Sequence, residues 1–259
     1  MEPSNIAAIR RSFAAQAANF ESPAMNFSKA EYLDYTVARI APAADEAVLE
    51  VAAGTCACGR AIAPFARTVT CLDITPAMLE VGRREAQARR LNNMIFVVGN
   101  AGALPFLDAS FDVAVSRLAF HHFPDVRRPF AEMARVLKPG GRLALIDMEA
   151  AEQPLRSVED EIEALRDPSH VQNLSQGEML ALYAEHSIAA LRCERTEIGV
   201  SLDAWMQLTQ TPDALQAQIA GRMAAELAGG PATGFSPYRV DGRLFFNQRW
   251  LLLIGKKPL

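Results

Sequence analysis

The stretch AVLEVAAGTCACGR, residues 47–60, joins a strand signal to a turn that carries glycine. Its first part, residues 47–52, is a short apolar run of the kind that forms a buried strand. The residues after Gly54 indicate a short helix. Strand, glycine-bearing turn and helix are the elements with which a nucleotide-binding α/β fold begins. We therefore predict an α/β domain in which this turn faces a ligand.

The next 90 residues continue the alternation of strands and helices. Apolar runs predict four further strands, at residues 68–73, 94–99, 111–117 and 142–148. One intervening helix starts at Thr75-Pro76, where Thr suits the N-cap and Pro the first helical position. Another covers residues 125–138 and stops at Pro139-Gly140-Gly141. Strands separated by helices predict a doubly wound parallel sheet with helices on both faces.

The remaining segments predict mainly helices. Helical patterns cover 5–20, Ser28–Ile40 (SKAE resembles a capping box), 155–166, 175–186 and 203–228, with a break at Pro212. Two late strands are expected at 191–200 and 243–257. We divide a single domain, 1–259, into a helical cap (1–44), a cofactor-binding core (45–150), and lid insertions with the last two strands (151–259).

Composition narrows the class of protein. The net charge of −4 and pI of about 5.7 argue against a nucleic-acid binder, which would carry a basic stripe. The four cysteines include one C-x-C pair and no second close pair, so we expect reduced thiols and no metal. The N-terminus has no signal-peptide pattern, and the apolar run 250–254 is too short to span a membrane. We expect a cytoplasmic protein.

The turn alone does not identify its nucleotide. A dinucleotide loop, G-x-G-x-x-G, needs glycine at 52, 54 and 57, and a G-x-G-x-G loop for S-adenosylmethionine needs it at 52, 54 and 56. Only Gly54 fits, because Ala52, Cys56 and Ala57 occupy the other positions. Asp73, 19 residues after Gly54, can accept hydrogen bonds from both ribose hydroxyls of an adenosine. Both cofactors contain that ribose, so both stay possible at this point.

Four collinear motifs separate the two possibilities. They are DITPAMLEVGR (73–83), GNAGALPFLDASFDVAVSR (99–117), HHFPDV (121–126) and VLKPGGRLAL (136–145). Together they resemble the class I S-adenosylmethionine-dependent methyltransferases, and most of all the type 11 family with the ubiquinone/menaquinone-biosynthesis methyltransferases. A weaker likeness to a YcgJ-type branch continues in LRDPSHV (165–171) and SLDAW (201–205). The resemblance implies a Rossmann-like seven-stranded sheet with its last strand antiparallel, a helical lid, and S-adenosylmethionine as cofactor.

The resemblance also assigns parts of the cofactor to residues. On the methionine side it places Glu50, which anchors the loop and the ammonium, together with Ala52, Gly54, Arg117 and Leu118. On the adenosine side it places Asp73 at the ribose and, around adenine, Ile74, Asn100 and Ala101. Asn100 stands where the family usually has Asp, and its side-chain carbonyl can still accept a hydrogen bond.

Two departures from the glycine loop bear on whether it works. Ala52 is tolerable if its φ is negative, because glycine is essential only at a positive φ or a tight contact. Cys56 must turn its side chain away from the cofactor, into the packing between helix and sheet. Under these conditions we expect a working loop.

Candidates for catalysis lie at the carboxyl edge of the sheet. Methyl transfer from a sulfonium is an in-line displacement that needs alignment, desolvation and, for some acceptors, a base. His121 and His122 follow the fourth strand and Asp147 ends the fifth, so a His–Asp pair can form. The alternative is that one histidine packs beneath the cofactor and the other caps the next helix. His170, in the predicted lid, is a second candidate, with a loop hydrogen bond as its alternative.

Other residues receive more ordinary interpretations. Arg166 and Asp167 are interpreted as a surface ion pair. The aromatic residues of the N-terminal helices are interpreted as core rather than substrate contacts: Phe13, Phe20, Phe27, Tyr32 and Tyr35. An apolar lid favours a small organic acceptor.

The predicted function is S-adenosylmethionine-dependent O-, N- or C-methylation of that acceptor. A non-catalytic S-adenosylmethionine-binding or interaction protein with a degenerate loop is the alternative, motivated by Ala52, Cys56 and Asn100. A nicotinamide oxidoreductase is a third reading. The sequence is compatible with a homodimer.

Overall fold

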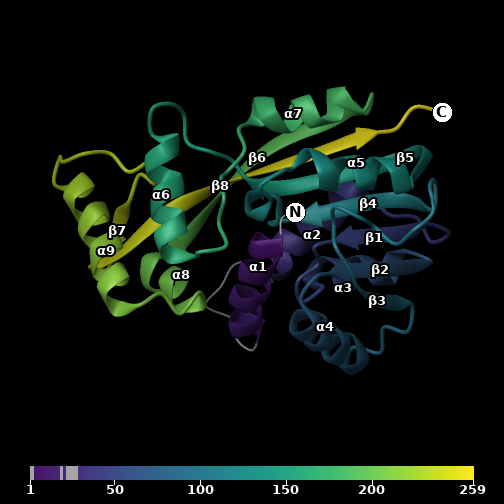
Figure 1. Ribbon diagram of the computed structural model, residues 1–259, viewed down its shortest axis with the longest axis horizontal. Coiled ribbons are helices and arrows are strands. Elements are labelled where there is room, and N and C mark those ends of the chain that lie inside the picture. Colours follow the sequence, from purple (N-terminus) through teal and green to yellow (C-terminus); the bar gives the residue numbers. More distant parts are fainter. Residues whose placement is uncertain (1–2, 18–19, 22–28) are drawn as a thin grey trace.

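A twisted sheet forms the centre of the computed structural model, which describes residues 3–17, 20–21 and 29–259 (Figure 1). The strand order is β3-β2-β1-β4-β5-β8-β6, and β7 pairs with β8. The strands are β1 Ala47–Val51, β2 Thr68–Asp73, β3 Met94–Val98, β4 Phe111–Arg117, β5 Leu137–Met148, β6 Ala189–Ser201, β7 Tyr238–Val240 and β8 Arg243–Lys256. β1 to β5 pair in parallel, and β8 runs antiparallel to both β5 and β6. The predicted doubly wound sheet with an antiparallel last strand is confirmed, and β7 is a short addition.

Helices cover both faces of the sheet. They are α1 Pro3–Gln16, α2 Ala30–Ile40, α3 Ala57–Ile62, α4 Pro76–Ala88, α5 Arg127–Val136, α6 Arg156–Arg166, α7 Gln176–Glu185, α8 Leu202–Leu208 and α9 Asp213–Leu227, with 3-10 turns at Ala63–Phe65 and Phe120–His122. Every residue of β1 is buried, because Leu49 and Val51 belong to the core that includes residues of α5 and α7, and Val48 belongs to the core that includes residues of α2, α3 and α4. The continuous apolar runs of the central strands therefore reflect burial on two sides.

Three helix boundaries can be compared with the expectation. α5 ends at Val136, and the Pro139-Gly140-Gly141 stretch lies inside β5, where the register with β4 shifts and Gly140 has φ +75°. α2 begins at Ala30, and Ser28, its predicted first residue, lies outside the described residues. Thr75 is the N-cap of α4 as predicted, although its side chain makes no capping hydrogen bond.

The lid combines sheet and helices. β6 and β8 continue past the end of β5, and their outer parts carry β7 and pack against α6, α8 and α9 (Figure 1). Trp205 of α8 and Phe246 of β8 lie at the centre of this second core, 5.0 Å apart between ring centroids. The sequence predicted its helices but not that the sheet itself extends into it.

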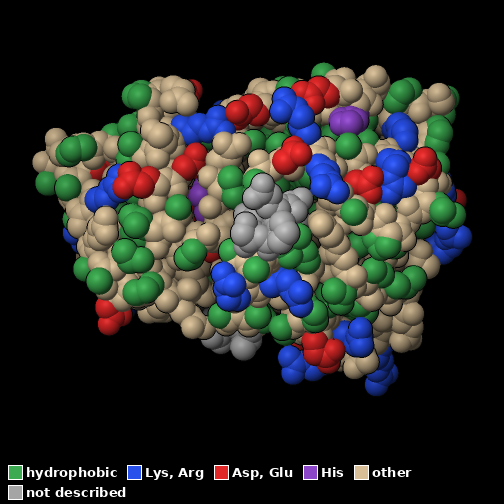
Figure 2. All heavy atoms as spheres, in the orientation of Figure 1, with side chains coloured by type: hydrophobic (Ala, Val, Ile, Leu, Met, Phe, Trp, Pro, Cys, Tyr) green, Lys and Arg blue, Asp and Glu red, His purple; other side chains and the backbone are tan. Residues whose placement is uncertain are grey.

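The surface mixes charges of both signs. Figure 2 shows basic and acidic side chains interspersed over the visible face, outside the grey atoms, as expected for a chain with a net charge of −4. Within the described ranges, no helix has both the length and the apolar character to cross a membrane.

Candidate active site

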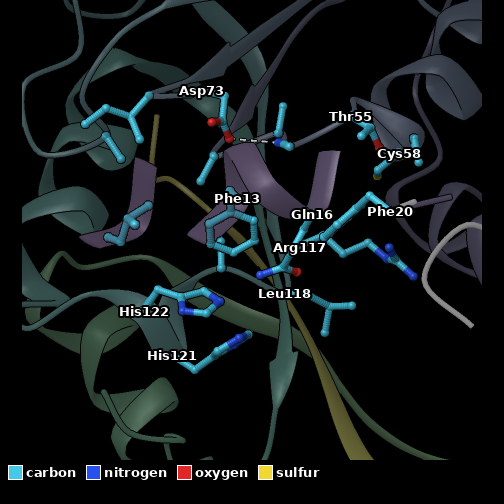
Figure 3. A pocket seen from close by; sticks show the side chains of 18 of the residues that line it. Phe13, Gln16, Phe20, Thr55, Cys58, Asp73, Arg117, Leu118, His121 and His122 are labelled. Carbon is cyan, nitrogen blue, oxygen red and sulfur yellow. Dashed lines mark hydrogen bonds between the residues drawn. The ribbon is translucent and has the colours of Figure 1, made fainter. Parts of the chain in front are cut away.

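A cavity opens at the carboxyl ends of β1, β2 and β4, the edge where open α/β sheets bind ligands. It contains about 1190 Å³ of non-protein space, its open mouth included. Figure 3 shows Asp73 at one end, His121 and His122 at the other, and Phe13 between them.

The turn after β1 has three residues in the left-handed region. Ala52 has φ +54°, Gly54 has φ +54° and Cys56 has φ +60°. The condition of a negative φ, under which Ala52 was expected to be tolerable, is therefore not met. A non-glycine residue in this conformation costs about 1–3 kcal/mol, which the surrounding structure must offset. The turn keeps the glycine-loop backbone at positions where the sequence has lost two glycines.

Cys56 is accommodated by a glycine on the facing helix. Its side chain is fully buried in the core between helix and sheet and does not line the cavity, as expected. A Cβ added to Gly82 of α4 would lie 2.8 Å from Cys56 Sγ and 2.6 Å from the Thr55 carbonyl oxygen. The missing side chain of Gly82 therefore makes the space that Cys56 fills.

Glu50 joins the turn to the strands beneath it. Its Oε2 accepts a hydrogen bond from the Gly59 N–H at 2.9 Å and one from Cys71 Sγ at 3.4 Å. Burial raises the pKa of Glu50 to about 7, although these donors favour the carboxylate. The ligand atoms of Glu50, Cys56 and Cys71 lie within 4.8 Å of one another, a spacing that could hold a metal ion. The hydrogen bonds already satisfy them without one.

Asp73 ties two loops together at the end of β2. Its Oδ2 accepts the Gly54 N–H and its Oδ1 accepts the Thr75 N–H, both at 2.8 Å. Burial raises the pKa of this carboxyl above its usual value, against the effect of those bonds. Each oxygen keeps a lone pair for a ligand hydroxyl.

Of the three residues expected around adenine, two line the cavity and Asn100 does not. Ile74 and Ala101 line the cavity beside Asp73, as does Gly99. Asn100 does not line it; its Oδ1 accepts the Gly102 N–H at 2.9 Å. Asn100 is thus held as a turn residue in this structure, and its assignment to the adenine amino group stays a prediction.

Arg117 is a half-buried cation with two buried nitrogens that lack a hydrogen-bond partner among the described residues. It follows β4, lines the cavity, and lies 5.0 Å from the centroid of the Trp250 ring. Its Nε and Nη2 are inaccessible to solvent and have no partner among the described residues. Burial lowers the pKa of Arg117, yet a guanidinium stays charged at neutral pH. Next to it, Leu118 lines the cavity with φ +55°.

The predicted His–Asp pair is formed by His121 and Asp147. His121 Nδ1 lies 2.6 Å from Asp147 Oδ1. Asp147 Oδ2 accepts the N–H groups of Ala119 and Phe120 at 3.1 and 2.6 Å, so the carboxylate itself lies beneath the cavity. Burial acts to lower the pKa of His121, but attraction to Asp147 outweighs it and the pKa is raised. We expect a charged imidazolium that holds the loop after β4 in place.

His122 has a different environment. Its Nδ1 lies 3.1 Å from both the carbonyl oxygen and the Oγ of Ser169. Its ring meets the Phe13 ring edge-on, with centroids 4.9 Å apart (Figure 3). Burial and the neighbouring His121 hold the pKa of His122 well below its usual value, so the ring is neutral. His122 lines the cavity, so a neutral imidazole is present there.

His170 does not line the cavity, which makes its prediction as a candidate base wrong. Its Nε2 lies 3.0 Å from Asp160 Oδ1, and its side chain is fully buried. Its side chain thus bonds to α6, and only its backbone N–H bonds within the loop, to the Asp167 carbonyl oxygen at 2.9 Å.

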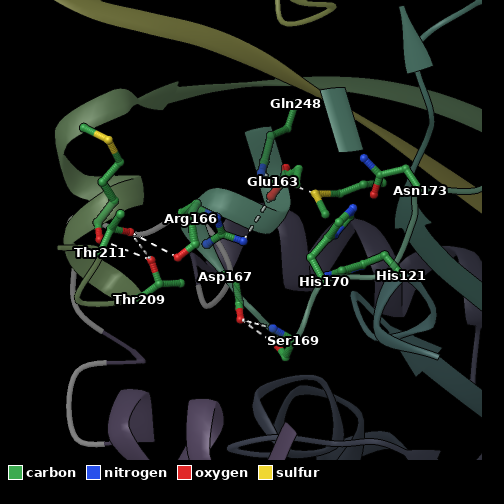
Figure 4. Close-up of polar contacts among 12 residues, drawn as sticks. His121, Glu163, Arg166, Asp167, Ser169, His170, Asn173, Thr209, Thr211 and Gln248 are labelled. Carbon is green, nitrogen blue, oxygen red and sulfur yellow. Dashed lines mark hydrogen bonds and ion pairs between the residues drawn. The ribbon is translucent and has the colours of Figure 1, made fainter. Parts of the chain in front are cut away.

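Arg166 and Asp167 are the site residues that the sequence interpretation missed. They are 6% and 2% exposed and both line the cavity, so they are not a surface pair. Arg166 lies 4.6 Å from the Trp205 ring centroid and donates to Glu163 Oε2 at 3.2 Å (Figure 4). The sequence signal that points to them is the likeness of LRDPSHV (165–171) to the YcgJ-type branch.

The N-terminal aromatic residues divide into two groups. Phe13 and Phe20 line the cavity, which corrects their assignment to the core. Tyr32 packs 5.5 Å from Trp250, and Tyr35 donates to Glu194. Phe27 lies outside the described residues.

Comparisons with known proteins agree with this geometry. Residues 49–145 match a family described as a methyltransferase domain. The uncharacterised methyltransferase YcgJ of Bacillus subtilis is 34% identical over 194 residues, which cover 74% of this chain and 77% of YcgJ. A demethylmenaquinone methyltransferase of Clavibacter sepedonicus is 32% identical over 174 residues, covering 66% of this chain and 68% of that protein. The crystal structure of YcgJ superposes with a TM-score of 0.80 at 29% identity, covering 89% of this chain and all of that one.

Proposed function

Because the chain belongs to the S-adenosylmethionine-dependent methyltransferase family, we propose that it methylates a small organic acceptor that loses a proton to His122. The protein is an enzyme, and its cofactor is S-adenosylmethionine. The observation that supports the finer proposal is one continuous cavity, with adenosine-type groups at one end and a neutral, buried imidazole at the other.

The residues present at the cofactor end fit this ligand. We assign Asp73 to the ribose hydroxyls, with Ile74 and Ala101 packing on adenine. Glu50 and Arg117 would hold the ammonium and the carboxylate of the methionine part, and Arg117 has unpaired buried donors for such a carboxylate. The remaining methionine contacts would come from Ala52, Gly54 and Leu118, all of which line the cavity.

The acceptor end would supply apolar walls and a base. Phe13, Met148 and Leu208 line it together with Arg166 and His122. When bound, S-adenosylmethionine supplies a methyl group on a sulfonium, which needs no further activation. His122 would take the acceptor's proton at Nε2, which leaves the acceptor's electron pair free to bond to the methyl carbon that the cofactor would give up, with S-adenosylhomocysteine as the product. The lowered pKa makes His122 a weak base, so it would take the proton only as the acceptor oxygen bonds to the methyl carbon, when that proton becomes strongly acidic. The hydroxyl of a phenol or hydroquinone suits this requirement.

The test starts from the acceptor that the relatives' names supply. Purified protein is incubated with S-adenosylmethionine and reduced demethylmenaquinone, then with simpler hydroquinones and phenols, and S-adenosylhomocysteine formation is measured by chromatography. We expect acceptor-dependent turnover with at least one of them. Cofactor binding in calorimetry without turnover on hydroxylated aromatics, but with turnover on amines, would contradict the proposed acceptor class.

Replacement of His122 by asparagine tests the base directly. Asn can still donate to the Ser169 carbonyl from its amide but offers nothing in place of Nε2. We expect kcat to fall by about 10²–10⁴-fold with an unchanged Kd for S-adenosylmethionine. An unchanged kcat with every acceptor would leave His122 as a packing residue.

The pKa of Glu50 predicts how cofactor affinity depends on pH. A carboxyl with a pKa of about 7 is mostly protonated at pH 6 and mostly ionised at pH 7.5. Cationic S-adenosylmethionine favours the ionised form, so binding releases a proton at the lower pH. We expect the Kd to be about eightfold smaller at pH 7.5 than at pH 6 in calorimetric titrations. Glu50→Gln should abolish this dependence, and a variant with the wild-type pH profile would contradict the assignment.

A further inference from the structure

A buried carboxylate lies behind the proposed base. Asp167, which directly follows α6, is surrounded by hydrogen-bond donors. Its Oδ1 accepts from Ser12 Oγ at 2.9 Å, from the Ser169 N–H at 2.9 Å and from Ser169 Oγ at 2.7 Å. Its Oδ2 lies 3.4 Å from Gln16 Nε2. Burial acts to raise the pKa of Asp167, but the Arg166 charge and the hydrogen bonds from Ser169 outweigh it, so the group is ionised.

An ionised carboxylate fixes the direction of the next hydrogen bond. It can only accept, so the single hydroxyl hydrogen of Ser169 points to Asp167. The Ser169 oxygen then offers only lone pairs to His122 Nδ1, and the Ser169 carbonyl oxygen, at the same 3.1 Å, also only accepts. In a neutral ring both contacts require the hydrogen on Nδ1. The lone pair is thereby left on Nε2, the nitrogen to which we assign proton removal.

Resting on that assignment, we propose that Asp167 is a positioning residue, which acts through the Ser169 hydroxyl to hold His122 in the tautomer with a free Nε2. The residue touches no reacting atom in this role. Without the carboxylate, the Ser169 hydroxyl could turn and donate to Nδ1, which would stabilise the opposite tautomer with its hydrogen on Nε2. That tautomer cannot accept a proton from the acceptor.

The other charged groups around the ring agree with this role. The His121 ring lies 4.1 Å from the His122 ring, and its positive charge opposes protonation of His122. Asp167 attracts a proton to His122, and His170 opposes one more weakly. The balance keeps the ring neutral, so that the tautomer, rather than the charge, decides whether Nε2 can act as a base.

The test reads the tautomer without any acceptor. The full chain is labelled with ¹⁵N-histidine, and the ring nitrogens of its four histidines are observed at neutral pH by long-range ¹H–¹⁵N correlation. His122 is assigned by the loss of its signals in His122→Asn. In the wild type we expect one pyrrole-like and one pyridine-like nitrogen, with the hydrogen on Nδ1. In Asp167→Ala we expect the two shifts to move toward each other, as in a mixture of tautomers, and kcat to fall severalfold with an unchanged cofactor Kd.

Three variants separate positioning from a merely structural role. Asp167→Asn keeps an oxygen for the Ser169 hydroxyl and should retain the wild-type shifts. Ser12→Ala removes one hydrogen-bond donor to Asp167 but leaves the carboxylate that accepts from the Ser169 hydroxyl. This variant should also retain the wild-type His122 shifts. The double variant Asp167→Ala with Ser169→Ala removes the hydroxyl that can turn, so the carbonyl oxygen alone should restore the hydrogen to Nδ1.

The overturning result is equally specific. Wild-type His122 shifts in folded Asp167→Ala would mean that the Ser169 carbonyl sets the tautomer alone. If the alanine variant does not fold, Asp167→Leu, which is closer in shape, is measured in its place with the same criterion. Because the spectra need no acceptor, failure of this proposal is distinct from failure of His122→Asn to lower kcat.

Discussion

Replacement of Asp73 by alanine should weaken S-adenosylmethionine binding at least 100-fold. The substitution removes two expected hydrogen bonds from the ribose hydroxyls to a buried carboxylate, and bonds to a charged group contribute about 1.5–3 kcal/mol each. It also releases the Gly54 and Thr75 N–H groups, which Asp73 holds at 2.8 Å. Together the two ribose bonds correspond to about 10²–10⁴ in Kd. Calorimetric titration with S-adenosylhomocysteine measures the loss without turnover.

Asparagine at the same position is the matched control. Asp73→Asn keeps one oxygen acceptor, so it should lose less affinity than alanine does. Thermal unfolding of the ligand-free variants shows whether the turn after β1 stays folded, since the freed N–H groups cost stability as well. A folded Asp73→Ala protein with a Kd within fivefold of the wild type would refute the ribose assignment.

The sequence predicted the core of the fold because its signals are local. A buried strand such as Ala47–Val51 reads as a continuous apolar run, and Thr75-Pro76 marks a helix start by rules that involve only neighbouring residues. The His121–Asp147 pair was also predictable, because consecutive parallel strands end at the same edge of the sheet. In a parallel sheet, residues that follow neighbouring strands lie close together even when they are far apart in the sequence.

The errors arose where distant segments decide the outcome. The positive φ of Ala52 is imposed by the turn as a whole, and the space for Cys56 is made by Gly82 on another helix. Arg166 and Asp167 look like an exposed pair until α1 and α8 cover them, and no local pattern shows that covering. The residues next to Arg166 and Asp167 in the sequence therefore do not show that these side chains are buried, because other parts of the chain cover them.

Replacement of Asp147 by alanine should cost about 3–5 kcal/mol of the free energy of unfolding. Asp147 is 1% exposed and accepts from Ala119, Phe120 and Met148 in addition to its contact with His121. Removal of one partner of a buried ion pair leaves the other charge unpaired, and here it also leaves three buried N–H groups without an acceptor. For a chain of this size, we expect the Tm to fall by about 6–20 °C. Urea unfolding followed by circular dichroism measures the free energy itself.

The pH dependence of that loss distinguishes the ion pair from packing alone. The pKa of Asp147 is lowered in the folded protein, because His121 outweighs its burial, so its contribution is present above the usual carboxyl pKa. The pKa of His121 is raised in the folded protein. Its contribution to the free energy of unfolding is therefore complete below the usual pKa of histidine and disappears as the pH rises through the pKa that His121 has in the folded protein. The difference in unfolding free energy between the wild type and Asp147→Ala should therefore be larger at pH 6 than at pH 9. Asp147→Asn, which keeps an acceptor for the N–H groups but not the charge, should lose mainly the pH-dependent part. A loss that is equal at both pH values would mean that Asp147 acts through its hydrogen bonds alone, with His121 neutral beside it.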